Sequence, residues 1–180
     1  MVIASLRKTE QAVDAYSHSI MKINQKNFPL NILLADDDMD DRIFFEKALM
    51  EIPVCTILNT VNNGELLMEY LLEHNNKLPD VLFLDLSMPR KTGFECLSEI
   101  KENEKLKALT VVMLTTSFTR GFDLEDNLKN TLTMMGAHDY IRKPADYNEL
   151  KAVVEKIIIE LVAKKDNNQK GNKVLPADVI

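Results

Sequence analysis

Residues 81–85 read Val-Leu-Phe-Leu-Asp, a run of four apolar residues that ends in a carboxylate. A second apolar run, Ile32–Ala35, ends in a similar way at Asp36–Asp38. Short runs that are apolar throughout are typical of parallel strands buried on both faces of a sheet. The two runs therefore predict two central strands of an α/β protein, each followed by acidic residues.

Strand-like and helix-like segments alternate around these two runs. Strands are predicted at residues 30–35, 55–61, 81–84, 110–114 and 140–142. Helices are predicted at about residues 40–51, 64–74, 94–103, 121–135 and 147–164. Five successive strand–helix units require right-handed crossovers between parallel strands. The predicted fold class is therefore α/β, a doubly wound five-stranded parallel sheet.

The composition of the 180 residues excludes several classes of protein. The net charge of −6, with its acidic excess in the central part of the chain, argues against a protein that coats nucleic acid. The apolar runs are far shorter than the about 20 residues of a membrane span. Cys55 and Cys96 are isolated thiols without metal-binding spacing, which suits a reducing compartment. We therefore expect a cytoplasmic protein that binds neither nucleic acid nor a membrane.

Three zones of the chain are predicted. Within residues 1–27, a series of positions spaced alternately by four and three residues is apolar at all but one position. This heptad pattern predicts an extra N-terminal helix. The pattern favours packing of this helix on its own domain, or fraying, over pairing with a second chain. Residues 28–165 form the main domain, and residues 166–180 form a C-terminal tail.

Polar side chains directly follow four of the five predicted strands. They are Asp36 to Asp38 after the first, Asp85 after the third, Thr115 to Ser117 after the fourth and Lys143 after the fifth. In an open α/β sheet, ligands bind at the carboxyl ends of the strands, where the strand order reverses. We therefore expect these groups to converge on one edge of the sheet.

The groups expected at this edge fit phosphoryl transfer. Converging carboxylates repel one another, and a hard divalent cation removes that cost. Mg²⁺ prefers one or two carboxylates, a carbonyl and water, and leaves positions open for phosphoryl oxygens. Lys143 adds an ammonium and Thr115 adds a hydroxyl. Together these groups can transfer a phosphoryl group to an aspartate.

Five aspartates of the first acidic stretch have two interpretations. Asp38, Asp40 and Asp41 are expected to be the N-cap and first-turn acids of the following helix, which the helix dipole favours. Asp36 and Asp37 stand directly at the end of a buried strand, so a ligand role is favoured for them. No single residue identifies the site, and the combination of residues carries the prediction.

Four motifs of the chain resemble those of one known family. They are ILLADDD at 32–38, VLFLDLSMPRKTGFE at 81–95, VVMLTTS at 111–117 and GAHDYIRKP at 136–144. In this order, each at a strand end, they resemble the receiver domain of two-component response regulators. The resemblance covers about three-quarters of the chain and implies a flavodoxin-like (βα)5 fold with strand order 2-1-3-4-5.

The resemblance also implies a Mg²⁺ site. Asp36 and Asp37 are similar to the acidic pair that holds the metal, with Asp37 as the more direct ligand. Asp85 and the backbone carbonyl of Ser87 complete the expected protein ligands.

The resemblance further implies the groups that handle the phosphoryl group. Asp85 is similar to the phosphoacceptor, and Lys143 to the ammonium that binds the transferred group. Thr115 is similar to the hydroxyl that turns toward it, and Tyr140 to the aromatic switch that follows. The peptide between Lys143 and Pro144 is expected to be cis, as it often is in this family.

The function implied by the resemblance is that of a single-domain response regulator. A sensor histidine kinase or a phosphotransfer protein would donate the phosphoryl group to Asp85. The protein would be a phosphoacceptor that assists its own phosphorylation and dephosphorylation, not an enzyme acting on a small substrate. Because the tail is too short for an output domain, the signal is expected to pass to a protein target. A phosphorylation-linked homodimer stays open by analogy.

Three features depart from the usual family pattern. Thr116 stands where Ala or Gly is most common, which predicts narrower access to the phosphoryl group. Ala145 stands where a large apolar residue is usual, which predicts altered packing under the last helix. The segment 117–135 is longer than usual and is expected to change partner recognition, while Ser87 and Ser117 flank the site and are expected to tune the lifetime of the phosphorylated state. Thr-Thr-Ser at 115–117 recurs in a subgroup of stand-alone receivers, some partnered with phytochrome-type kinases.

Two alternatives of different class are weighed against this function. A phosphorylation-independent interaction module would typically have lost Asp85, the acidic pair or Lys143, and all are present. An aspartate-nucleophile phosphohydrolase would have its nucleophile after the first strand, as Asp36–Asp38 loosely allows. That class also needs a later acidic pair and a cap insertion, and neither is evident in the sequence.

Overall fold

The structure is a computed structural model that describes residues 29–116 and 122–171, with side chains described for 29–116 and 125–165. The strands are β1 (Leu30–Ala35), β2 (Thr56–Val61), β3 (Val81–Asp85), β4 (Val111–Thr115) and β5 (Asp139–Arg142). The helices are α2 (Met39–Met50), α3 (Gly64–Glu73), α4 (Gly93–Glu102), α5 (Phe122–Met134) and α6 (Tyr147–Gly171). None of these helices is long and apolar enough to span a membrane.

The five strands form one parallel sheet in the order β2-β1-β3-β4-β5. The order reverses at β1, which pairs with β2 on one side and with β3 on the other. This topology confirms the predicted doubly wound α/β fold. The reversal places the carboxyl ends of β1 and β3 next to each other, which is where ligands bind in such sheets.

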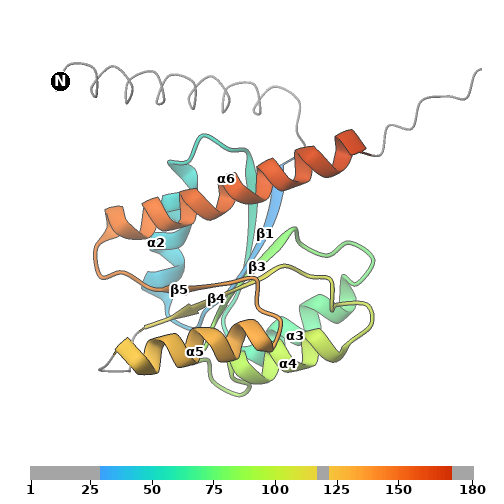
Figure 1. The fold of residues 1–180 in the computed structure, drawn as a ribbon, viewed down its shortest axis with the longest axis vertical. Coiled ribbons are helices and arrows are strands. Elements are labelled where there is room, and N and C mark those ends of the chain that lie inside the picture. The colour runs from blue at the N-terminus through green and yellow to red at the C-terminus, as the bar shows by residue number, and fades with distance from the viewer. Residues whose placement is uncertain (1–28, 117–121, 172–180) are drawn as a thin grey trace, which may run out of the picture.

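Two apolar cores lie on opposite faces of the sheet (Figure 1). Helices α2 and α6 cover one face, and α3, α4 and α5 cover the other. In β1, Ile32 and Leu34 pack toward the first pair of helices, while Leu33 and Ala35 pack toward the other three. Because side chains alternate along a strand, a central strand must be apolar at every position to fill both cores. This requirement explains the unbroken apolar runs of β1 and β3.

Helix starts at the carboxyl edge are capped by side chains. Asp38 caps α2 and accepts hydrogen bonds from the backbone of Asp40 and Asp41, and Asn63 caps α3. Asp146 accepts from the backbone nitrogens of Asn148 and Glu149 at 2.8 and 3.1 Å at the start of α6. These caps satisfy orphan N–H groups and fix where each loop ends.

Two glycines allow loops near the carboxyl edge to pack closely. A Cβ on Gly93 would lie 2.2 Å from the carbonyl oxygen of Asp85, and one on Gly64 would lie 2.1 Å from the carbonyl oxygen of Lys91. No side chain fits at either distance. The start of α4 therefore sits directly against the backbone of the strand end that carries Asp85.

Three expectations differ from the structure or fall outside it. Helix α6 continues to Gly171, seven residues beyond its predicted end at residue 164, because no proline interrupts the sequence before Pro176. The Lys143–Pro144 peptide is not cis, since the described residues contain no cis peptide bond. The predicted N-terminal helix within residues 1–27, the stretch 117–121 and residues 172–180 lie outside the described residues.

Candidate functional site

The two buried carboxylates of the site stand at the ends of neighbouring central strands. β1 pairs with β3 in the register Ala35↔Leu84, so Asp36 and Asp85 come next to each other at the carboxyl edge. These two residues are 1% and 4% exposed. Charged residues are rarely buried so fully unless they are paired. Their burial therefore indicates a partner of opposite charge.

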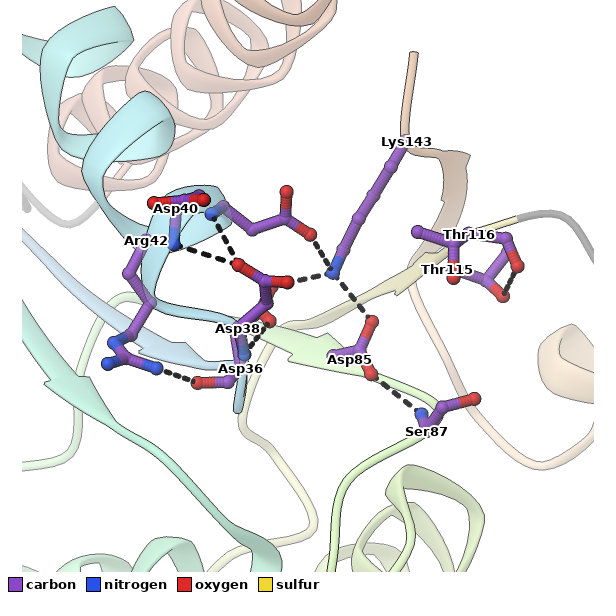
Figure 2. Close-up of polar contacts among 10 residues, drawn as sticks. Asp36, Asp38, Asp40, Arg42, Asp85, Ser87, Thr115, Thr116 and Lys143 are labelled. Atoms are coloured by element: carbon purple, nitrogen blue, oxygen red, sulfur yellow. Dashed lines mark hydrogen bonds and ion pairs between the residues drawn. The ribbon is translucent and has the colours of Figure 1, made fainter. Parts of the chain in front are cut away.

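That partner is Lys143, which follows β5, and β5 is separated from β1 by the two strands β3 and β4. Its backbone nitrogen donates to the carbonyl of Thr115 at 2.8 Å, which fixes the start of the side chain beside β4. The ammonium lies 2.7 Å from Asp36 Oδ2, 2.8 Å from Asp85 Oδ1 and 2.8 Å from Asp41 Oδ2 (Figure 2). The structure thus brings together Asp36, Asp85 and Lys143, which the sequence predicted to converge.

Burial and charge act on Asp36 in opposite directions. Burial is the main reason why the pKa of Asp36 rises to about 6. The hydrogen bond and the positive charge of Lys143 lower this pKa, while the nearby Asp85 raises it. An ionised Asp36 is therefore costly unless more positive charge reaches the site.

The ammonium of Lys143 stays protonated at this site. Burial lowers the pKa of Lys143, but its hydrogen bonds to Asp36, Asp41 and Asp85 outweigh burial and raise that pKa above its ordinary value. One ammonium faces three carboxylates. With all of them ionised, the cluster has an excess of two negative charges.

The donor set fits a hard divalent cation. Two buried carboxylates with excess negative charge, and backbone carbonyls of the neighbouring loops, are the oxygen ligands that Mg²⁺ and Mn²⁺ accept. As the side chains stand, the described part of the chain holds no group of three or more Asp, Glu, His or Cys arranged to hold a metal ion. Lys143 lies between the carboxylates instead, so the ammonium and a metal would share the same oxygens.

Two further predicted metal ligands lie beside the buried pair. Asp37 follows Asp36 and is exposed, and among the described residues its side chain makes no hydrogen bond or ion pair. The backbone nitrogen of Ser87 donates to Asp85 Oδ2 at 2.7 Å, so the loop after β3 folds back onto the carboxylate (Figure 2). Both residues are near the site, and their roles as ligands stay predictions.

The predicted switch residues are not gathered around the carboxylates. Thr115 is buried at the end of β4, and its hydroxyl donates to the carbonyl of Thr116 at 3.2 Å (Figure 2). Thr116 is exposed, and Ser117 lies outside the described residues. Tyr140 is half-buried on β5, where burial raises its pKa and the negative charge of Glu125 adds to the effect. The hydroxyl of Thr115 must rotate before it can donate to a group on Asp85.

The first turn of α2 contributes one contact that the sequence did not predict. Asp38 is the N-cap and Asp40 and Asp41 are first-turn acids, as expected. However, Asp41 also pairs with Lys143. The only sequence signal for this contact is that a helix starts at the edge where the polar residues converge.

A cavity of about 450 Å³ adjoins the site between α2 and the start of α6. Asp36, Asp41 and Lys143 form its polar side, and Phe44, Pro144 and Tyr147 are among its apolar walls. Ala145 also lines it. The altered packing predicted at Ala145 stays a prediction.

Comparison with known proteins agrees with this geometry. Residues 32–155 match the response regulator receiver domain family. The probable methanogenesis regulatory protein FilR2 of Methanothrix harundinacea is 33% identical over 72% of this chain and 81% of its own length. The response regulator Rcp1 of Synechocystis is 35% identical over 52% of this chain and 67% of its own length.

Solved structures give the same result. The phosphorylated cyanobacterial phytochrome response regulator RcpA is 33% identical, with a TM-score of 0.63 over 72% of this chain and 91% of that chain. The Mn²⁺-bound form of response regulator Rcp1 is 31% identical, with a TM-score of 0.61 over the same shares. Receiver domains bind a divalent metal and interact with histidine kinases or phosphotransfer proteins. The match along residues 32–155, the sheet order and the placement of Asp36, Asp85 and Lys143 together show that this chain belongs to the response regulator receiver domain family of two-component signalling.

Proposed function

We propose that this receiver domain accepts a phosphoryl group on Asp85, with Mg²⁺ as the metal. The observation that carries the proposal is the position of the Asp85 carboxylate. It is buried at the end of a central strand, with Oδ1 held by the ammonium of Lys143 and Oδ2 held by the backbone nitrogen of Ser87. A carboxylate fixed at both oxygens is oriented before a donor arrives.

Asp85 is a better acceptor than Asp36, although both are buried. Burial raises the pKa of Asp36 to about 6, so a cation at the site would favour the ionised form of this carboxyl. Its backbone carbonyl also accepts from Arg42 at 2.7 Å, and its Oδ1 accepts from the backbone nitrogen of Asp38 at 3.1 Å. These contacts hold Asp36 against α2, which suits a metal ligand more than an attacking group.

The metal would be held by Asp36, Asp37, Asp85 and the carbonyl of Ser87. When bound, Mg²⁺ supplies positive charge that neutralises the phosphoryl oxygens. It would also offset the excess negative charge of the carboxylates around Lys143.

The residues of the chain then have separate tasks. A carboxylate oxygen of Asp85 attacks phosphorus in line, the bond from phosphorus to the donor imidazole nitrogen breaks, and the electron pair of that bond leaves with the imidazole. The ammonium of Lys143 donates to the transferred oxygens. Thr115 releases the carbonyl of Thr116 and turns its hydroxyl toward the acyl phosphate.

The response to phosphorylation is a local movement with a wider effect. The rotation of Thr115 changes the space beside β4, and Tyr140 on the neighbouring strand β5 moves into it. Such a change biases two arrangements of the surface around β5, which a histidine kinase, a phosphotransfer protein or a protein target would distinguish.

The test is incorporation of phosphate from acetyl phosphate, read by the mass of the intact protein. We expect one phosphoryl group on the wild type in Mg²⁺ and none after EDTA or in Asp85→Asn. Asp40→Asn is a matched control, because Asp40 is exposed and lies outside the cluster around Lys143. Equal incorporation in Asp85→Asn and the wild type would refute the proposal.

A further inference from the structure

Asp41 differs from the other two carboxylates that contact Lys143. It lies in the first turn of α2, not at a strand end, and its Oδ2 is 2.8 Å from the ammonium. Its side chain is 35% exposed, whereas those of Asp36 and Asp85 are 2% and 5% exposed. Asp41 is therefore the outermost of the three partners of Lys143.

Three carboxylates surround the ammonium of Lys143, which has three N–H donors. The contact with Asp41 is a hydrogen bond from Nζ to Oδ2. Two of these carboxylates have other tasks in the proposed function, since Asp36 would hold the metal and Asp85 would carry the phosphoryl group. Asp41 is the partner that neither task requires.

We propose that Asp41 is a positioning residue for Lys143. It holds the ammonium over the acceptor while Asp36 and Asp85 are engaged by the metal and the phosphoryl group. This inference rests on the proposed function, because it assumes that Lys143 acts on a phosphoryl group at Asp85.

A lysine side chain is flexible, so its ammonium needs a fixed partner to stay in one position. The side chain of lysine has four rotatable bonds and loses much conformational freedom when it is held in one arrangement. Its backbone is fixed at β4, and its tip must cross to the carboxylates of β1 and β3. A carboxylate on the opposite side of the site keeps the chain extended across this gap.

The first turn of α2 is well suited to supply that carboxylate. Asp38 accepts from the backbone nitrogens of Asp40 and Asp41 at 2.8 and 3.2 Å. Arg42, the next residue, donates to the carbonyl of Asp36. The turn that carries Asp41 is therefore tied at its start and to the end of β1, so the position of the carboxylate is fixed relative to the site.

The matched comparison is Asp41→Asn against Asp40→Asn. Both residues are first-turn acids of the same helix, so the helix dipole acts on both, but only Asp41 contacts Lys143. At saturating Mg²⁺ and limiting acetyl phosphate, we expect the phosphorylation rate of Asp41→Asn to fall about three- to tenfold. The rate of Asp40→Asn should stay within about twofold of the wild type.

A second pair of variants separates positioning from a structural role. In a Lys143→Met background, adding Asp41→Asn should leave the residual phosphorylation rate unchanged. The effects of the two substitutions on the melting temperature should also be coupled. The double variant should lose less in melting temperature than the sum of the losses in the two single variants.

The outcomes are distinct. If Asp41→Asn matches Asp40→Asn in rate, or slows the Lys143→Met variant as much as the wild type, the positioning role is wrong. If the wild type itself takes up no phosphate, the proposed function fails, and the coupling of melting temperatures still decides whether Asp41 acts through Lys143.

Discussion

The two edges of the sheet each hold an aspartate–lysine contact of the same length, in very different surroundings. At the carboxyl edge, Lys143 lies 2.8 Å from Asp85, and the side chains are 10% and 5% exposed. At the amino edge, Lys165 of α6 lies 2.8 Å from Asp80, and the side chains are 38% and 26% exposed. Asp80 also accepts from the backbone nitrogen of Asn31.

The difference lies in charge balance and burial, not in distance. Among the residues whose side chains are described, Lys165 pairs with one carboxylate, while Lys143 faces three. A balanced and partly exposed pair contributes little beyond joining two elements. A buried cluster with excess negative charge is costly by itself, and it becomes favourable when a cation or another positively charged group binds. The contact of Lys165 with Asp80 is therefore structural, whereas the carboxylates around Lys143 form a cluster that a cation would stabilise.

Replacing Lys143 at the carboxyl edge should have a much larger effect on phosphorylation and stability than replacing Lys165 at the amino edge. Lys143→Met leaves buried carboxylates without their ammonium, so we expect a phosphorylation rate lower by about 100-fold or more. The free energy of unfolding without metal should fall by about 3 kcal/mol or more. Lys165→Met should cost at most about 1 kcal/mol and leave phosphorylation unchanged. Acetyl phosphate kinetics and urea unfolding measure both, and equal effects of the two substitutions would contradict the distinction.

The backbone behind Asp85 should be the next most sensitive feature. In Gly93→Ala, the new Cβ would meet the carbonyl oxygen of Asp85, so the strand end must move. We expect a loss of about 1–3 kcal/mol in unfolding free energy and a lower phosphorylation rate. Lys105→Ala, at an exposed position, should change stability by less than about 0.5 kcal/mol. A fully stable Gly93→Ala protein would show that the close approach is not required.

Metal should stabilise the fold through the carboxyl edge alone. If Mg²⁺ binds only the native state, a concentration of about ten times its Kd should add about 1.4 kcal/mol to the free energy of unfolding. Asp36→Asn should abolish this gain, and Lys165→Met should retain it. Thermal unfolding with and without EDTA measures the effect, and an undiminished gain in Asp36→Asn would place the metal elsewhere.

The smallest expected effect is on the reactivity of the two cysteine thiols. The alkylation rate of the buried Cys96 reports whether reagent reaches the apolar core next to the site. Burial raises the pKa of Cys96 to about 11, whereas Cys55 is exposed. Because the thiolate is the reactive form, Cys96 should be nearly inert at pH 8 and become reactive as the pH approaches its pKa. Alkylation followed by mass spectrometry should find one modified thiol in the native protein and two after unfolding. Faster labelling of Cys96 in Gly93→Ala would show that the packing at Gly93 protects the core around Cys96. Rapid labelling of Cys96 in the wild type would contradict its burial.

Most of the fold was predictable from local patterns. The apolar runs of β1 and β3 reflect burial on both faces, and strand bounds differ from the prediction by at most one residue. The end of α6 was not predictable in the same way, because helix periodicity past residue 164 is weak and the sequence has no stop signal before Gly171.

The site was predictable where a residue stands at a strand end. Asp36, Asp85 and Lys143 satisfied that rule, and sheet topology brought them together. The contact of Asp41 with Lys143 depends on how α2 is oriented at the carboxyl edge of the sheet. The requirement for glycine at position 93 depends on how closely the start of α4 approaches the backbone of Asp85. Neither quantity is encoded in spacing along the chain.

Locating the phosphorylated residue shows whether Asp85 is the phosphoacceptor. The wild type would be phosphorylated with acetyl phosphate in Mg²⁺, reduced with borohydride, which converts an acyl phosphate on aspartate into homoserine, and digested for peptide mass mapping. We expect homoserine at position 85 and at no other aspartate. Homoserine at position 36, or phosphate that resists borohydride and stays on another type of side chain, would contradict it.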